Sequence, residues 1–232
     1  MSENSNCLSR VIPLAIWGHR LNSDSLHAAV KLVVLITNSN ESVIEACYLY
    51  CFAISSLLRD NDAKKTYQLT RDEAARRAGL TGNSTLLDWF ADLIEADTQS
   101  KLPLPSERPT TNIKIPFVLT FYYLFKGYSY QQAIRDILGR GGDTKTNAAI
   151  VGGMFGAQGI QRINQEVVSE VLNFQEPYSQ QSIYNLSQGD LVTKLINIVD
   201  QAPKYLKVTL SNQTFTFDQL KAHYRAQLGQ DL

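Results

Sequence analysis

Apolar residues recur at helical spacing along most of the chain. Residues 23–36 predict an amphipathic helix with Ser23 or Asp24 as its N-cap. Its apolar side consists of Leu26, Ala29, Val30, Val33 and Val34. Residues 41–58 are apolar on almost every side, which predicts a helix in the centre of the core. Residues 115–125 are apolar and aromatic throughout, which predicts a second buried helix.

Polar start signals predict three further helices. Thr70 and Glu73 form a capping-box pattern that predicts a polar helix ending near Gly79. Ser129 and Gln132 repeat that pattern before a helix that stops at Gly139. Between them, Asn83 or Ser84 is the predicted cap of a helix through about Ala96, and a proline-containing, linker-like loop follows over residues 97–114. The inward positions of the helix after Asn83 are predicted to be Leu86, Leu87, Phe90, Leu93 and Ile94.

The last part of the chain has a different pattern. Residues 165–172 continue the helical series, and an amphipathic helix capped by Ser187 closes before Pro203. Residues 205–210 and 213–217 alternate apolar and polar positions, which predicts a β-hairpin, and a terminal helix opens at Thr216. We therefore expect an all-α domain over residues 1–175. A C-terminal extension over 176–232, made of helix, hairpin and helix, is expected to pack on or beside it.

Residues 141–159 are the most informative stretch for chemistry. A glycine pair leads into a helix whose first turn carries Asp143, Thr144, Lys145 and Thr146. The N-terminus of a helix presents unpaired N–H groups and suits an anion such as phosphate. An acidic, hydroxyl-bearing first turn also suits a hard cation with oxygen ligands.

Composition limits the classes of partner and the compartment. The chain has 22 Lys and Arg against 22 Asp and Glu, so its balanced charge gives no electrostatic case for nucleic acid or a membrane surface. We expect no apolar stretch near the roughly 20 residues that span a bilayer, and no signal peptide. Three cysteines indicate a reducing compartment, and we predict a cytoplasmic protein of its own cell or of a host cell. Cys47 and Cys51 share a helix face and are interpreted as buried free thiols, with a metal pair as the alternative.

The stretch 141–159 resembles the C-terminal signature of the ADP-ribosylglycohydrolase family, Gly-Gly-Asp-Thr-Asp-Thr before Asn-Ala-Ala. Three further blocks resemble family segments in the same order, at residues 7–17, 36–58 and 115–138. Together they extend the resemblance over about residues 5–173.

The resemblance implies an all-helical fold whose cleft holds two magnesium ions and positions ADP-ribose for cleavage from a protein side chain. It assigns Asp143 and Thr146 to the metal, if a metal is retained. It assigns six residues to a remnant ligand cleft: Gly142, Asp143, Thr144, Lys145, Thr146 and Asn38.

Four departures from the family pattern argue against hydrolysis by this chain. Lys145 replaces a ligand aspartate, and an ammonium beside a cation is unfavourable by several kcal/mol. Asn38 replaces a histidine, and the family's glycine before Met-Arg is lost, with Asn6 and Cys7 in its place. Glu3 is the sole acid before Cys7, where the family has an acidic cluster. We therefore predict an inactive family member, without a cofactor, that binds ADP-ribose, an ADP-ribosylated protein or another protein.

Two alternatives remain open. The first is an active magnesium-dependent ADP-ribosyl hydrolase whose missing ligands come from a partner or dimer chain. The second is a purely structural or regulatory helical module. A protein partner or a homo-oligomer is expected under each of these hypotheses.

Several side chains allow a functional and a structural interpretation. Lys145 either pairs with Asp143 or points to solvent, and Arg140 either clamps a phosphate or is a solvated loop residue. The small residues after Lys145 either admit a ligand or allow close helix packing, which we favour; they are Gly152, Gly153, Gly156 and Ala157. The aromatic side chains of residues 121–125 are interpreted as core rather than as an adenine platform. We interpret the three histidines as surface or helix-end residues; they are His19, His27 and His223.

Overall fold

The computed structural model describes residues 3–95, 102–103, 109–173, 207–210 and 213–216. The chain divides into two units, residues 1–163 and residues 164–232, which are described separately. The predicted boundary at residue 175 stays a prediction.

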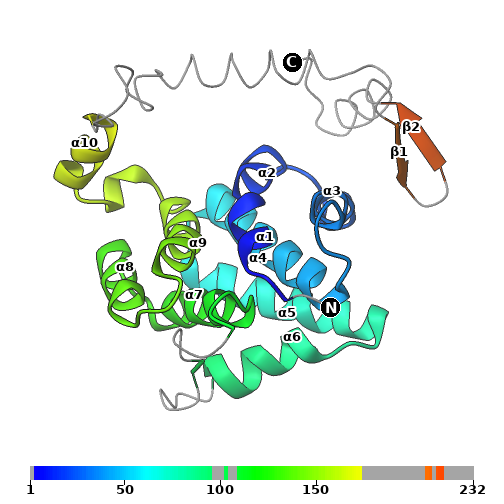
Figure 1. Cartoon of the computed structure of the whole chain (residues 1–232), viewed down its shortest axis with the longest axis horizontal. Coiled ribbons are helices and arrows are strands. Elements are labelled where there is room, and N and C mark those ends of the chain that lie inside the picture. Colours follow the sequence, from blue (N-terminus) through cyan, green and yellow to red (C-terminus); the bar gives the residue numbers. More distant parts are fainter. Residues whose placement is uncertain (1–2, 96–101, 104–108, 174–206, 211–212, 217–232) are drawn as a thin grey trace. The chain divides into compact units, whose positions relative to one another are not determined.

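The described part of the first unit is built from helices (Figure 1). They are α1 (Asn6–Arg10), α2 (Ile12–Trp17), α3 (Ser23–Leu35), α4 (Glu41–Asp60), α5 (Ala63–Thr81), α6 (Thr85–Asp88), the π-helix η1 (Trp89–Glu95), α7 (Lys114–Lys126), α8 (Tyr130–Gly139), α9 (Thr144–Gly156) and the 3₁₀-helix η3 (Ile160–Arg162). The predicted all-α class is confirmed.

Helix α4 is the centre of the first unit, as the apolar run predicts. It contacts α1, α2, α3, α5, α6 and α9, and its side chains from Val43 to Leu57 are buried except Phe52. By length and composition α4 could also cross a membrane, so the expectation that no stretch is long and apolar enough is wrong for this helix. Because 78% of its apolar window is buried inside the protein, the fold itself accounts for this composition.

Helix α7 carries the aromatic half of the core. Its side chains from Ile115 to Leu124 are buried, whereas Phe125 is 39% exposed. The rings of Phe117 and Phe121 lie 4.7 Å apart between centroids, and Phe121 lies 5.1 Å from Phe90 of η1. The interpretation of these aromatic residues as core is confirmed for all but Phe125.

Two predicted helix starts need correction. Asn22, not Ser23 or Asp24, caps α3, because its side chain accepts the N–H of Ser25 at 2.9 Å. Helix α5 begins at Ala63 instead of Thr70, with Asp62 accepting the N–H of Lys65, and it runs to Thr81, beyond the predicted end at Gly79.

The predicted helix after Asn83 is partly correct. It begins at Thr85, but Ser84 makes no capping hydrogen bond, and from Trp89 the winding changes to a π-helix. Leu86, Phe90 and Ile94 are buried, whereas Leu87 and Leu93 are half-buried.

The second unit contains α10 (Gln165–Asn173) and a two-stranded antiparallel sheet of β1 (Lys207–Leu210) and β2 (Gln213–Thr216). Leu210 pairs with Gln213, so a two-residue connection joins the strands, as the predicted hairpin requires. The hairpin is confirmed. Three predictions lie outside the described residues: the helix after Ser187, the terminal helix after Thr216, and the placement of His223. Of the predicted linker-like loop, only residues 102–103 and 109–114 are described.

Candidate functional site

The signature turn, defined as Gly141–Thr146, connects α8 to α9. Gly141 and Gly142 have φ values of 77° and 73°, in the left-handed region that glycine adopts without strain. Asp143 follows as the N-cap of α9, and its Oδ1 accepts the backbone N–H of Thr146 at 3.3 Å. The acid that the sequence assigns to a metal is therefore used to begin a helix.

Lys145 is exposed in the first turn of α9, and no ion pair joins it to Asp143 in the part of the chain that the structure describes. This position matches the solvent-facing alternative. Thr144 and Thr146 are half-buried, and Gly142 is exposed. The turn thus places the Lys145 ammonium and the Asp143 carboxylate, which caps the helix, at the N-terminus of α9.

Arg140 anchors the signature turn from the α8 side. Its Nε lies 2.6 Å from Asp136 Oδ2, and Tyr123 of α7 donates its hydroxyl to the same oxygen at 2.5 Å. Burial raises the pKa of the Tyr123 hydroxyl, and its hydrogen bond to Asp136 raises it further. The guanidinium is therefore paired with a carboxylate and is only 20% exposed, so Arg140 is not a solvated loop residue, and its phosphate-clamping role stays a prediction.

Asn38 lies in the connection between α3 and α4. Its side chain is buried, with 8% exposure, and its Oδ1 accepts the N–H of Asn40 at 2.9 Å. The neighbouring Thr37 hydroxyl accepts a hydrogen bond from Arg10 Nη2 of α1 at 2.8 Å. Helix α1 also contacts α9, so it connects this segment to the helix of the signature turn.

The side chains at the signature turn do not fit the two-magnesium site that the resemblance implies. Magnesium needs near-octahedral oxygen coordination, and Asp143 offers one carboxylate, of which one oxygen already caps α9. Glu3 accepts a hydrogen bond from Asn112 at 3.2 Å. Within the described residues, no group of three or more His, Cys, Asp or Glu side chains is placed to hold a metal ion.

The small residues of α9 serve close packing at one position. A Cβ atom added at Gly153 would lie 2.6 Å from Ile12 Cδ1 and 2.9 Å from the Tyr50 hydroxyl oxygen. That hydroxyl is fixed, because it donates to the Ile150 carbonyl at 2.6 Å. At Gly156 an added Cβ meets nothing within 4 Å.

Gly153→Ala is therefore expected to lower the free energy of unfolding by about 1–3 kcal/mol, the usual penalty for overpacking. Gly156→Ala is the matched control on the same helix and is expected to be neutral or slightly stabilising. Urea denaturation of both variants measures the difference. Equal stability of the two would contradict the close approach of α9 to α2 and α4.

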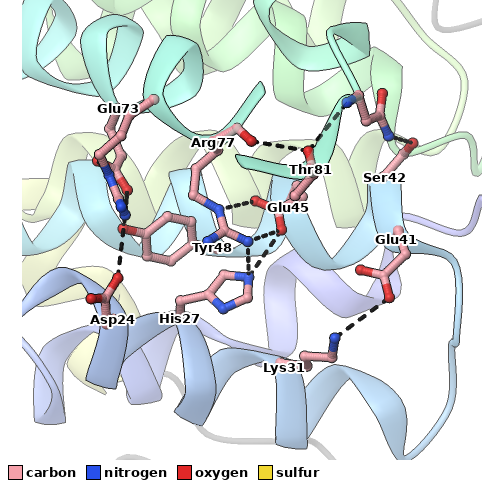
Figure 2. Close-up of polar contacts among 12 residues, drawn as sticks. Asp24, His27, Lys31, Glu41, Ser42, Glu45, Tyr48, Glu73, Arg77 and Thr81 are labelled. Atoms are coloured by element: carbon pink, nitrogen blue, oxygen red, sulfur yellow. Dashed lines mark hydrogen bonds and ion pairs between the residues drawn. The ribbon is translucent and has the colours of Figure 1, made fainter. Parts of the chain in front are cut away.

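A buried polar cluster that the sequence interpretation missed lies between α3, α4 and α5 (Figure 2). Arg77 makes a two-pronged ion pair with Glu45, with Nε donating to Oε2 at 2.8 Å. His27 Nε2 lies 2.9 Å from Glu45 Oε1 and 2.8 Å from Arg77 Nη2. We call these three residues the Glu45 cluster. The prediction that His27 is a surface or helix-end residue is wrong, since its side chain is only 15% exposed.

A second buried acid lies beside the Glu45 cluster. Glu73 accepts the hydroxyl of Tyr48 at 2.5 Å and both Nε and Nη2 of Arg76 at 2.8 Å. Burial of Glu45 disfavours its charge, but the hydrogen bonds from Arg77 and His27 outweigh burial and lower its pKa to about 2. Since basic or hydroxyl partners occupy both carboxylates, the cluster is suited to holding α3, α4 and α5 together rather than to proton transfer. The sequence signal for this cluster was Glu45, the single acid inside the apolar run of residues 43–57.

The family model of ADP-ribosylglycohydrolase matches residues 1–201 of the chain. The match reaches beyond residue 173, where the resemblance was expected to end. No curated protein and no solved structure matches the chain.

Proposed function

The chain belongs to the ADP-ribosylglycohydrolase family, and from this premise we propose that it is a non-hydrolysing member that binds ADP-ribose or an ADP-ribosylated protein. The observation that carries the proposal is the first turn of α9, where an exposed Lys145 stands beside the capping Asp143. Lys145 in this turn stands where the family pattern has an aspartate, so the charge of the turn differs from that pattern.

The binding part of the proposal rests on the chemistry of a helix N-terminus. Thr146 gives its N–H to Asp143, which leaves the N–H groups of Thr144 and Lys145 without an acceptor inside the helix. These groups, the positive end of the helix dipole and the Lys145 ammonium all favour a negatively charged oxygen. The diphosphate of ADP-ribose supplies such oxygens.

The loss of hydrolysis rests on the side chains available to a metal. Two magnesium ions would polarise the leaving oxygen and lower the pKa of a water, but they need several carboxylates in one place. Asp143 brings one carboxylate, and Lys145 brings a positive charge two residues away. For this reason we assign no hydrolytic step to Asp143 or Thr146.

Lys145→Ala is expected to weaken ADP-ribose binding about tenfold, since a hydrogen bond from a charged group contributes about 1.5–3 kcal/mol. Isothermal titration of the full chain with ADP-ribose, with and without magnesium, measures it. Lys64→Ala is the matched control, because Lys64 occupies the same place after the capping Asp62 in α5 and is also exposed. We expect the control to bind like the unaltered protein.

The titration, a turnover assay and light scattering each test a different part of the proposal. Absence of heat with the unaltered protein removes ADP-ribose as a ligand and leaves a protein partner. Turnover of ADP-ribosylated arginine or serine peptides with magnesium would overturn the assignment as non-hydrolysing. If light scattering showed that only an oligomer turns over the peptides, this would favour a metal site whose ligands are completed by a second chain. The cytoplasmic location and the protein partner stay predictions.

A further inference from the structure

One polar side chain of α9 is buried without a partner. Asn147 follows the signature turn with 0% exposure, and neither its Oδ1 nor its Nδ2 has a hydrogen-bond partner among the described residues. Asn22 and Asn40, by contrast, use their side-chain oxygens to cap α3 and α4. A buried carboxamide without partners destabilises a fold, because it has given up its hydrogen bonds to water. Packing alone therefore does not explain an asparagine at this position, where an apolar side chain would avoid that penalty.

Helical geometry directs the Asn147 side chain toward the signature turn. Asn147 comes three residues after Thr144 and four after Asp143, so the three residues share one face of α9. A Cα–Cβ bond in a helix tilts toward the N-terminus, so the carboxamide covers the turn that precedes Asn147. Both Asp143 and Thr144 are half-buried. The protein surface is therefore one helical turn from Asn147, on the side toward which its side chain leans, and a rotation of that side chain is enough to reach it.

The spacing along α9 indicates which chemical group the carboxamide fits. The N–H groups of Thr144 and Lys145 suit a phosphate, and Asn147 follows Thr144 by about 4.5 Å along the helix axis, at 1.5 Å per residue. A carboxamide carries a donor and an acceptor side by side, so it matches a group that offers both, such as a sugar hydroxyl. In ribose 5-phosphate the hydroxyls belong to the sugar that carries the phosphate, so the two groups are close enough to reach both parts of α9 together. The hydroxyls are also uncharged, which suits a buried neutral side chain.

We propose that Asn147 recognises a ribose hydroxyl in a ribose 5-phosphate unit whose phosphate lies at the N-terminus of α9. The inference rests on the proposed binding of ADP-ribose, which contains two such units. The Oδ1 atom of Asn147 accepts a hydroxyl proton and Nδ2 donates to a hydroxyl oxygen, so the ligand supplies the hydrogen bonds that the fold leaves unmade. Asn147 is then the residue that distinguishes a ribose phosphate from inorganic phosphate.

Asn147→Leu in the full chain tests this role, because leucine has the same branching and no polar atoms. The variant is expected to bind ADP-ribose and ribose 5-phosphate about tenfold more weakly, with an unchanged affinity for inorganic phosphate. Its thermal midpoint is expected to rise by about 2–4 °C, because the unpaired polar atoms are gone. Isothermal titration with the three ligands and a melting curve measure the two effects. Weaker binding together with higher stability is a combination that a residue needed only for packing does not give.

Thr120→Val on α7 is the matched control. The Thr120 hydroxyl is also fully buried and has no hydrogen-bond partner in the part of the chain that the structure describes, and valine keeps the shape of threonine. The control should show a similar rise of the thermal midpoint but bind ADP-ribose like the unaltered protein. If leucine overpacks the site and lowers the midpoint, Asn147→Ala is expected to show the same loss of ribose 5-phosphate binding with inorganic phosphate unaffected.

Two results would overturn the role of Asn147 while leaving the proposed function intact. One is ADP-ribose binding that neither Asn147→Leu nor Asn147→Ala weakens. The other is an equal loss of inorganic phosphate and ribose 5-phosphate, which would mean that the replacement distorts the helix end. Failure of the unaltered protein to bind both ADP-ribose and ribose 5-phosphate would overturn the role of Asn147 and the proposed ligand together.

Discussion

Arg77→Ala is expected to lower the free energy of unfolding by about 3–5 kcal/mol, the usual effect of removing one partner from a buried ion pair. The Arg77 side chain is 13% exposed and that of Glu45 8%, so most of the pair is shielded from water. Truncation leaves a buried carboxylate facing His27 alone. Urea denaturation monitored by circular dichroism measures the change.

Arg71→Ala is the matched control for this prediction. Arg71 also lies on α5 and pairs with an acid, Glu95, at 2.6 Å, but the two side chains are 37% and 26% exposed. Pairs of that exposure contribute about 0.2–1 kcal/mol. If Arg77→Ala were no more destabilising than Arg71→Ala, the Glu45 cluster would not hold α4 and α5 together. The double replacement Glu45→Met with Arg77→Met is expected to recover part of the loss, since it removes both buried charges.

Acidification is expected to remove about 3 kcal/mol of stability through Glu45 alone, because a pKa shift of one unit corresponds to 1.36 kcal/mol. The pKa of Glu45 falls from an ordinary value of 4.5 to about 2 in the folded protein. A depressed carboxyl pKa stabilises the fold above the unfolded pKa, and this stabilisation is lost as the pH falls through the folded pKa. The window therefore runs from about pH 5 down to pH 2.

The variant Glu45→Gln measures how much of the stability lost on acidification comes from Glu45. The variant has no carboxyl to protonate, so its stability should change less between pH 5 and pH 2 than that of the unaltered protein. Asp60→Asn is the comparison, because the Asp60 side chain is 39% exposed and pairs with Lys65 at the surface. The same pH dependence in all three proteins would show that Glu45 carries no linked proton between the folded and unfolded states.

The sequence predicted the helices that local signals define. The Ser129–Gln132 capping box opens α8 as expected, and the apolar run of α4 is the centre of the core. At Thr70 the same kind of signal was misleading, because the Thr70 hydroxyl bonds to the Thr66 carbonyl in mid-helix and Glu73 is turned to Tyr48 and Arg76. A capping pattern is local, whereas the use of Glu73 depends on residues 25 positions away.

For the candidate site too, the sequence predicted local features and missed the contacts that depend on tertiary packing. Residue types alone placed Asp143 and Lys145 in the first turn of a helix after a glycine pair. The pair between Arg140 and Asp136 is an i,i+4 contact that helical spacing could have indicated, whereas the hydrogen bond from Tyr123 of α7 to the same carboxylate depends on tertiary packing. The Glu45 cluster was missed for a related reason, since His27, Glu45 and Arg77 come from three helices and form no motif along the sequence.

The hydrogen bond from Tyr50 to Ile150 has a consequence for how the chain is made. It joins α4 to a helix 100 residues later, so α4 leaves the ribosome long before α9 can cover it. At the usual ~5–20 residues per second, the delay is about 5–20 s. During that interval the side of α4 that α9 later covers stays open, on a helix that by length and composition alone could cross a membrane. Chaperone binding to the nascent α4 segment would shield it until the later helices are synthesised.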